Sequence, residues 1–405
     1  MHILLVSYEF PPAMATGGIG SYIHHLANLM YGKGHSVSVI SATAEETEQV
    51  INRGFCMNYL VPATDQKKFR QLALQLFEKK FKPGEVDLME SPEVGACALE
   101  IAQKYPGIPL LVKMHTPGVL ITKVSNTYQP LLTKLRYVAG AFLRGRFDLG
   151  YWSRHDLNKE NNPEYIICTK ASLILSPSAA LKKWATTYWG LPEEKFLLLP
   201  NPFTVDEEMF GFPVERSKKT ICFVGKLTVL KGMMTFTPAL RKILEKNPLY
   251  NAVLIGRDEP VSNEMPSMLK WMQDQLGTVA DRVRFTGTLT AAEVKKELAN
   301  SAVAVIPSLW ENYPTVVLEA MAAGCAVAAS SRGGIPEIIR HEQNGLLFDP
   351  AKTASIVNAI QQLITDSAMQ QRLALAGRQT IQHSNSEEFI NATERIYSSV
   401  ARTLN

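Results

Sequence analysis

Two glutamates eight residues apart, Glu311 and Glu319, are the strongest candidates for binding chemistry in this sequence. Glu311 falls in a short polar loop after an apolar run, and Pro314 suits the first turn of a helix, where its missing N–H costs nothing. That helix is predicted to run to Ala323, with Gly324 as its C-cap. Glu319 would lie one turn inside the helix, where a carboxylate can accept hydrogen bonds from two hydroxyls of a polyol such as a ribose.

The beginning of the same helix predicts an anion site. Free backbone N–H groups and the positive end of the helix dipole would together suit a diphosphate. Glu311 could then hold sugar hydroxyls on the other side of the phosphates. Glutamates at this spacing often occur by chance, and Glu319 alone would more commonly be a solvated or capping residue, but the flanking loop, proline and glycine favour a ligand site. The predicted site covers Asn312, Tyr313, Pro314, Thr315 and Val316, and every one of these except Pro314 has a backbone N–H to donate.

Other candidates lie at the ends of predicted strands, where ligands bind in α/β folds. The glycines of GGIGSY, Gly17, Gly18 and Gly20, are predicted to form a loop before a helix that lets backbone approach a phosphate or an acceptor. His115 ends the apolar run LLVKMH, although a lone histidine is often structural. Glu90 ends VDLMES and is a weaker candidate for binding acceptor hydroxyls.

These residues would be positioned by two successive runs of alternating strands and helices. Apolar runs such as HILLVSY and ASLILSPS alternate with helical stretches in the first half, and the alternation restarts at TICFVG, from Thr220. The proline-containing stretch PNPFTVDEEMFGFPVERSKK between them predicts a linker. We therefore expect two Rossmann-like, doubly wound α/β domains, residues 1–205 and 206–385, facing each other across a ligand-binding cleft. Residues 386–405 are expected to form a helix that packs back on the N-terminal domain.

Composition excludes several classes of protein. The 405 residues are 46% hydrophobic, so each domain can bury a core, and the net charge of +4 is too weak to indicate nucleic-acid binding. Five scattered cysteines predict buried thiols in a reducing cytoplasm. The N-terminus lacks a signal-peptide layout, and no apolar stretch is long enough to span a membrane. No metal-ligand, P-loop or GxSxG pattern is present, so neither a metal nor a cofactor is expected.

The motifs resemble those of the retaining glycosyltransferases of family 4, which have the GT-B fold and include the glycogen-synthase-like, group 1 enzymes. Glu311-x7-Glu319 followed by GGIPEII resembles the family's most informative segment. GKLTVLKG, from Gly225, resembles its GRL-x3-KG segment, and GGIGSYIHHL resembles its N-terminal glycine loop. MHTP resembles the strand end that bears the active-site histidine, and LPNPF resembles the interdomain segment. The resemblance covers the whole chain, with the five segments in the expected order.

The resemblance implies a role for each matching residue. Lys226 and Lys231 would face the nucleotide diphosphate, with Lys226 as a point charge where the family usually has a bidentate arginine. His115 would contact the donor sugar or the acceptor near the reacting centre. The expected catalytic residues are His115, Glu311, Lys226 and Lys231. The expected donor-binding set adds Gly17, Gly18, Gly225, Gly256, Arg257, Thr286, Leu289, residues 312–316 and Glu319, and the acceptor set is Gly20, Glu90 and His115.

The implied reaction is transfer of a hexosyl group from a nucleoside diphosphate sugar to an acceptor hydroxyl, with retention of the anomeric configuration. UDP is the favoured nucleotide because it is common in the family, and the product would be a glycan, a glycolipid or a small glycoside. Alternatives are an epimerase or phosphorylase on the same fold, and an inactive sugar-nucleotide-binding protein. An NAD-linked oxidoreductase is least expected, because the GxGxxG fingerprint and its acidic partner are missing.

A basic stretch raises the question of a membrane partner. Between residues 101 and 147 there are seven basic residues and no acidic one, and LLTKLRYVAGAFLRGRF interleaves apolar and basic positions. The simpler interpretation is a solvated helix–loop insertion. The alternative is peripheral contact with an anionic membrane on its cytoplasmic face, carried by Lys134, Arg136, Arg144 and Arg146. The seven residues are Lys104, Lys113, Lys123, Lys134, Arg136, Arg144 and Arg146.

Overall fold

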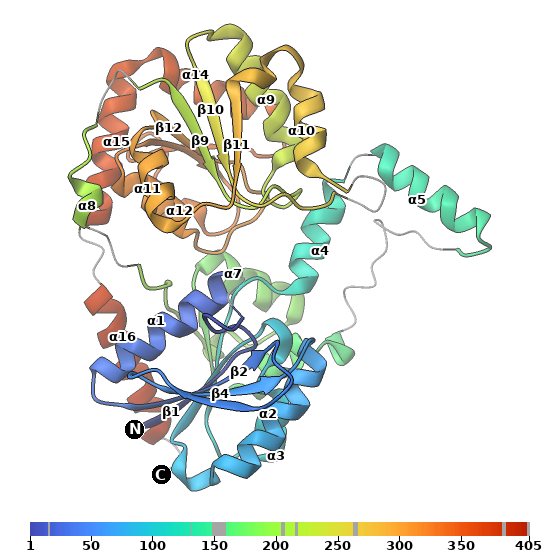
Figure 1. The fold of residues 1–405 in the computed structure, drawn as a ribbon, viewed down its shortest axis with the longest axis vertical. Coiled ribbons are helices and arrows are strands. Elements are labelled where there is room, and N and C mark those ends of the chain that lie inside the picture. The colour runs from blue at the N-terminus through green and yellow to red at the C-terminus, as the bar shows by residue number, and fades with distance from the viewer. Residues whose placement is uncertain are drawn as a thin grey trace. The chain divides into compact units, whose positions relative to one another are not determined.

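The computed structural model describes residues 1–14, 17–129, 131–147, 159–203, 207–214, 218–261, 266–382 and 386–402. The chain forms two compact units, each built around a largely parallel sheet with helices on it (Figure 1), which confirms the prediction of two parallel-sheet α/β domains. The first unit comprises Met1–Val119, His155–Pro202 and Ser386–Asn405, and the second comprises Leu120–Arg154 and Phe203–Asn385. The stretch from Leu120 thus groups with the second unit, whereas we expected it in the first. The expected boundaries at 205 and 385 lie outside the described residues.

The sheet of the first unit has the order β3-β4-β2-β1-β5-β6-β7-β8, and its neighbours are parallel except for the antiparallel pair β3–β4. Six strands fall on the predicted apolar runs, as expected where both faces of a parallel sheet are covered. They are β1 (His2–Val6), β2 (Ser36–Thr43), β5 (Leu88–Pro92), β6 (Leu110–Lys113), β7 (Leu173–Ser176) and β8 (Phe196–Leu198). The edge hairpin of β3 (Gln49–Asn52) and β4 (Met57–Pro62) was not predicted.

Helices from three parts of the chain cover this sheet. The C-terminal helix α16 (Ser386–Arg402) packs against α1 (Gly18–Gly32) and β5, and its Phe389 and Tyr397 join the first unit's core. The other helices are α2 (Gln66–Lys80), α3 (Leu99–Lys104), α6 (Pro163–Lys170) and α7 (Ala179–Trp184). Short helical turns lie at Pro83–Glu85, Val94–Ala96, Lys159–Asn161, Ala185–Trp189 and Glu193–Lys195.

The sheet of the second unit is parallel throughout, with the order β11-β10-β9-β12-β13-β14. Its strands are β9 (Thr220–Val224), β10 (Asn251–Ile255), β11 (Val283–Gly287), β12 (Val303–Ile306), β13 (Ala326–Ser330) and β14 (Leu346–Phe348), of which only β14 was not predicted. The helices in chain order are α4 (Gly118–Thr127), α5 (Leu131–Leu143), α8 (Glu207–Phe210), α9 (Met233–Lys246), α10 (Met268–Leu276), the turn Gly277–Arg282, α11 (Ala291–Ala299), α12 (Thr315–Ala322), α13 (Ile335–Ile338), α14 (Thr353–Thr365) and α15 (Ser367–Gln382).

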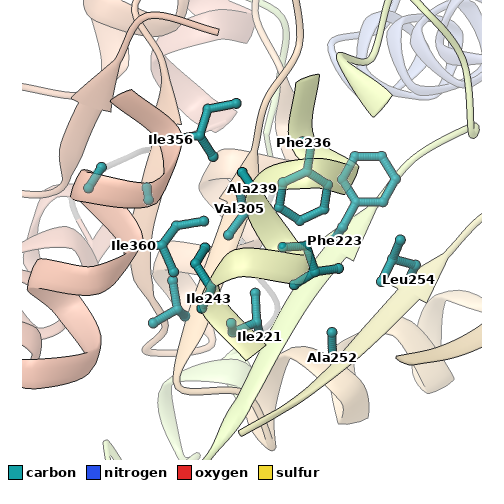
Figure 2. Close-up of a cluster of buried hydrophobic side chains, with 14 of the residues drawn as sticks. Ile221, Phe223, Phe236, Ala239, Ile243, Ala252, Leu254, Val305, Ile356 and Ile360 are labelled. Carbon is teal, nitrogen blue, oxygen red and sulfur yellow. The ribbon is translucent and has the colours of Figure 1, made fainter. Parts of the chain in front are cut away.

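The hydrophobic core under the second sheet fixes the strand ends that carry the candidate site. Phe236, Ala239 and Ile243 lie at helical spacing on α9 and pack onto β9, β10 and β12, while α14 contributes Ile356 and Ile360 (Figure 2). All five side chains are fully buried, and burial of each large one contributes roughly 1.5–3 kcal/mol. The loop before α9 is therefore held at the carboxyl end of β9. Within the described residues, none of the helices has the length and apolar character needed to cross a bilayer.

Candidate active site

The predicted donor-binding residues lie at one edge of the second unit's sheet. Gly225 and Lys226 follow β9, Gly256 and Arg257 follow β10, and the loop 307–314 follows β12. Because all six strands run parallel, their carboxyl ends meet at the same edge, which is where ligands bind in folds of this kind. Residues from five separate chain segments are thereby brought together, including Thr286 at the end of β11 and the glycine pair that follows β13.

Backbone hydrogen bonds join the loops after β9, β10 and β11. The N–H of Gly225 donates to the carbonyl of Ile255 at 2.8 Å, and the N–H of Gly256 donates to that of Gly287 at 2.8 Å. A Cβ atom on Gly256 would lie only 1.9 Å from the Gly225 carbonyl oxygen, so glycine is required there. The exposed guanidinium of Arg257 pairs with Glu259, and Leu289 packs partly against the buried cluster of the sheet. The predicted nucleobase region thus contains hydrogen-bonded backbone at Gly225 and Gly256, with the exposed Arg257 side chain beside it.

The central contact of the site joins Lys231 to Glu311. The Lys231 ammonium forms an ion pair with Glu311 Oε1, and the buried Ser308 hydroxyl donates to the same oxygen at 2.7 Å. The Lys231 and Glu311 side chains keep 28% and 15% of their surface exposed, so both remain accessible to a ligand. The backbone N–H of Lys231 donates to Thr228 Oγ1 at 3.1 Å, which fixes the turn before α9. Lys231 and Glu311, which are 80 positions apart in the sequence, are therefore in direct contact at the site.

Two glycines allow the Glu311 loop to approach its neighbours. The N–H of Gly334 donates to the Glu311 carbonyl at 2.8 Å, and Gly333 has a φ of +62°. A Cβ atom on Gly333 would lie 2.0 Å from the Glu311 carbonyl oxygen. On the other side, a Cβ atom on Gly232, whose φ is +78°, would lie 1.9 Å from the Pro307 carbonyl oxygen. The Glu311 loop therefore lies between Gly232 and Gly333, two positions at which only glycine fits without a clash.

Helix α12 follows this loop, with small departures from the prediction. Pro314 has extended backbone and is the N-cap rather than a first-turn residue, and Ala323 is the C-cap with the left-handed Gly324 after it. Asn312 is buried, and its side-chain oxygen accepts a hydrogen bond from Trp310 Nε1 at 2.6 Å. Glu319 lies one turn inside α12, where burial raises the pKa of its carboxyl, while a hydrogen bond from Thr315 and the charge of Lys295 oppose that rise.

In the first unit, the structure contradicts the prediction that Glu90 binds an acceptor. The Glu90 side chain is fully buried, and its two oxygens accept hydrogen bonds from the hydroxyls of Tyr22 on α1, at 2.8 Å, and Tyr397 on α16. Burial raises the pKa of Glu90, and the hydrogen bonds from Tyr397 and Tyr22 oppose the rise. Glu90 therefore joins β5 to α16 through the hydrogen bond from Tyr397, and its side chain has no exposed surface that an acceptor could contact.

His115 is positioned by residues that sequence reasoning missed. Its backbone N–H donates to both carboxylate oxygens of the buried Glu93, at 2.8 and 2.7 Å, and its ring stacks edge-on to Tyr22 at 5.6 Å. The adjacent Lys113 is fully buried, donates to the Leu199 carbonyl and lies over the Tyr22 ring. Burial lowers the pKa of Lys113, against the opposing charges of Glu90 and Glu93. The available sequence signal for Glu93 was its charge, at the beginning of the otherwise apolar run EVGACAL.

The glycine segment of the first unit also differs from the prediction. Helix α1 already begins at Gly18, so only Gly17 precedes it, as the N-cap. The N–H of Gly20 donates to Glu9 Oε2 at 3.3 Å, and the same carboxylate lies beside Gly17. The negative charge of Glu9 would repel a phosphate at this helix terminus, and its carboxylate already accepts the hydrogen bond from the Gly20 N–H. The binding role predicted for Gly20 therefore competes with Glu9, and the roles of Gly17 and Gly18 stay predictions.

Known proteins match both halves of the chain. Residues 16–207 match the family model described as Glycosyltransferase Family 4, and residues 205–380 match that described as Glycosyl transferases group 1. An uncharacterized glycosyltransferase of Methanocaldococcus jannaschii is 28% identical over 378 residues, 90% of each chain. Sucrose-phosphate synthase from Thermosynechococcus elongatus has a TM-score of 0.76 at 19% identity over 99% of both chains. An Anabaena protein in complex with UDP-glucose has a TM-score of 0.66 at 17% identity, covering 98% of this chain and 100% of that one.

The fold and these matches define a glycosyltransferase of the GT-B class. The chain belongs to the family that these two models describe, glycosyltransferase family 4 with its group 1 C-terminal half. The resemblance drawn from five sequence motifs is thereby confirmed for family, fold and transferase activity.

Proposed function

We propose that the protein transfers a hexosyl group from a nucleoside diphosphate sugar, with UDP as the favoured nucleotide, to an acceptor hydroxyl with retention of configuration. The observation that carries the proposal is the cluster of Lys231, Glu311 and Ser308 beside the beginning of α12. It combines a cation, a helix N-terminus and a carboxylate, which are the groups that a diphosphate joined to a sugar requires.

Each group of the second unit has a distinct task in this proposal. Lys226, Lys231 and the N–H groups at the beginning of α12 neutralise the charge that develops on the leaving diphosphate, which is how a preorganised site lowers a barrier. Glu311 accepts hydrogen bonds from donor-sugar hydroxyls, and Glu319 accepts those of the ribose. The ion pair with Glu311 holds the Lys231 ammonium in place before the donor arrives, so little reorganisation is needed.

The first unit supplies the histidine. We assign to His115 a contact with the donor sugar or the acceptor near the reacting carbon, because Glu93 and Tyr22 fix its backbone and ring while part of its side chain stays exposed. The leaving diphosphate would take the acceptor's proton, so that no side chain need act as a nucleophile. The scheme invokes no metal, because Lys226, Lys231 and the beginning of α12 all face the diphosphate in it.

The choice of UDP is supported by the Anabaena neighbour, which was solved with UDP-glucose. In this proposal, backbone groups of the loops after β10 and β11 pair with the edge of the uracil. The acceptor class proposed is a glycan, a glycolipid or a small glycoside.

Calorimetry with UDP, GDP, ADP and their glucose conjugates tests the donor assignment. We expect UDP-glucose to bind more tightly than its GDP and ADP counterparts, and to be hydrolysed slowly in the absence of an acceptor. Proton NMR of the released glucose should then show the α-anomer first if the configuration is retained. A chain that binds none of these nucleotides would refute the donor site, whereas binding without turnover would favour an inactive sugar-nucleotide-binding protein.

A further inference from the structure

Helix α5 and the residues just after it expose an apolar surface. Leu131, Leu135 and Phe142 lie on one face of the helix, at positions i, i+4 and i+11, and are 66%, 51% and 75% exposed. Leu143, at the end of the helix, and Phe147, just after it, are 84% and 93% exposed. Figure 1 shows α5, in teal, to the side of the helices that cover the second unit's sheet. Large apolar side chains gathered in this way mark an interaction site rather than ordinary surface.

Three exposed arginines accompany this surface. Arg136 lies within α5, and Arg144 and Arg146 follow its end. The segment from residue 101 to 147 contains no acidic residue, so no negative charge in it offsets these cations. Apolar residues beside basic ones, on a helix of 13 residues that is too short to cross a bilayer, are typical of helices that lie in a membrane interface.

Three of the seven basic residues between 101 and 147 are buried or paired with an acidic residue in the structure. Lys113 is buried in the first unit, and Lys104 pairs with Glu78. Lys134 is buried as well, where its ammonium donates to the Thr127 carbonyl at 2.8 Å and burial lowers its pKa. Lys134 therefore stabilises the connection between α4 and α5 and does not contribute to a charged surface.

We propose that α5 docks on an anionic lipid bilayer through Leu131, Leu135, Phe142, Leu143 and Phe147, with Arg136, Arg144 and Arg146 contacting the lipid headgroups. We call these eight residues the α5 surface. An apolar partner protein would leave the three arginines without counter-charges, whereas an anionic bilayer provides both an apolar layer and negative headgroups. The docking is independent of the transfer reaction, so it can be tested without a donor or an acceptor.

Co-sedimentation of the full chain with vesicles tests the proposal. We expect the wild-type protein to pellet with phosphatidylcholine vesicles that contain phosphatidylglycerol, but not with phosphatidylcholine alone. Raising the salt to about 1 M, where the Debye length is about 3 Å, should release most of it. Each arginine contributes about 1 kcal/mol at most, so the triple variant Arg136→Gln, Arg144→Gln and Arg146→Gln should bind up to about 100-fold more weakly.

Two further variants separate docking from general charge and from folding. The double variant Phe142→Ser and Leu143→Ser keeps every charge and should lose at least about tenfold in partitioning, because two apolar side chains no longer enter the bilayer. The matched control, Lys67→Gln, Lys68→Gln and Lys80→Gln, removes three exposed cations from α2 and should bind as the wild type does.

Several outcomes would overturn the proposal. One is a wild-type chain that stays in the supernatant at low salt, and another is an α2 control that loses as much binding as the arginine variant. A third is a concentration-dependent dimer in sedimentation velocity that Phe142→Ser dissociates, since the surface would then bind a second copy of the chain. Circular dichroism of each variant, expected to match the wild type, keeps a loss of binding from being mistaken for a loss of fold.

Discussion

Replacing Gly333 by alanine should displace the Glu311 loop and reduce catalysis. The added Cβ atom would lie 2.0 Å from the Glu311 carbonyl oxygen, whereas real Cβ contacts are at least about 3.0 Å long. The Glu311 backbone must therefore move by roughly 1 Å, since the atom in the way belongs to the backbone rather than to a flexible side chain. The same movement pulls Glu311 away from Lys231 and Ser308.

The expected size of the effect has two parts. A non-glycine residue at a φ of +62° loses roughly 1–2 kcal/mol of stability, and forcing an atom into a filled space adds about 1–3 kcal/mol. A displacement of 1 Å at a catalytic group can reduce the rate by about 100-fold. We therefore expect Gly333→Ala to be destabilised by roughly 2–5 kcal/mol and to retain on the order of 1% of wild-type kcat.

Gly34→Ala is the matched control. Gly34 has a φ of +82°, but nothing lies within 4 Å of its Cβ position, so this variant isolates the conformational part. It should lose about 1–2 kcal/mol of stability and keep its kcat. Urea unfolding followed by circular dichroism gives the stabilities, and release of the nucleoside diphosphate from the donor gives the rates.

The reasoning fails if Gly333→Ala and Gly34→Ala lose the same stability and both retain wild-type kcat. That result would mean that the Glu311 loop accommodates a methyl group without moving, or that its position does not matter to the reaction.

Three further predictions concern single side chains. Glu319→Ala should weaken UDP binding in calorimetry by roughly 1.5–3 kcal/mol, as loss of charge-assisted hydrogen bonds does, while the exposed Glu194→Ala leaves it unchanged; equal affinities would refute the ribose role. Lys231→Ala should lower kcat by about 100-fold, as loss of an oxyanion donor does, compared with the exposed Lys270→Ala; a raised KM with intact kcat would instead indicate uniform binding. Glu164 has its pKa raised to about 7 by burial and by the charge of Glu93, so its contribution to stability is present below about pH 4.5 and is lost as pH rises through 7. Glu164→Gln should therefore gain thermal stability relative to the wild type between pH 5 and pH 8, and a pH-independent difference would contradict this assignment.

The strands were predictable for a clear physical reason. Strands such as β1 and β12 are buried on both faces, so their apolar runs stand out from the polar loops around them. The edge strand β3 alternates half-buried and exposed residues, so it has no apolar run. The apolar run of β14 is only LLF, between Gly345 and Asp349, and is shorter than the run FLLL that revealed β8. The same alternation of apolar runs and polar loops predicted that the Glu311 loop follows the end of a strand.

The site was predictable only in part. Glu311 was found from the loop, Pro314 and Gly324 around it, and Lys231 from the resemblance of GKLTVLKG to the family's GRL-x3-KG segment. Lys113 is one of the seven basic residues between 101 and 147, and nothing in the sequence shows that β6 carries its ammonium to the Leu199 carbonyl. Glu90 and Glu93 lie in one short segment, and only contacts from distant residues show that one binds Tyr397 and the other His115.

The hydrogen bond between Tyr397 and Glu90 joins residues 307 positions apart, and this separation sets an order of events during synthesis. At roughly 5–20 residues per second, a ribosome needs about 15–60 seconds to pass from one to the other. Throughout that interval the nascent first unit has a carboxylate in its core with one of its two tyrosines missing, and an uncovered face where α16 will pack. The second unit, whose sheet lies entirely between Thr220 and Phe348, can close before the first is complete. The first part of the chain to emerge is therefore the last to mature, and it is the part that a chaperone would have most time to bind.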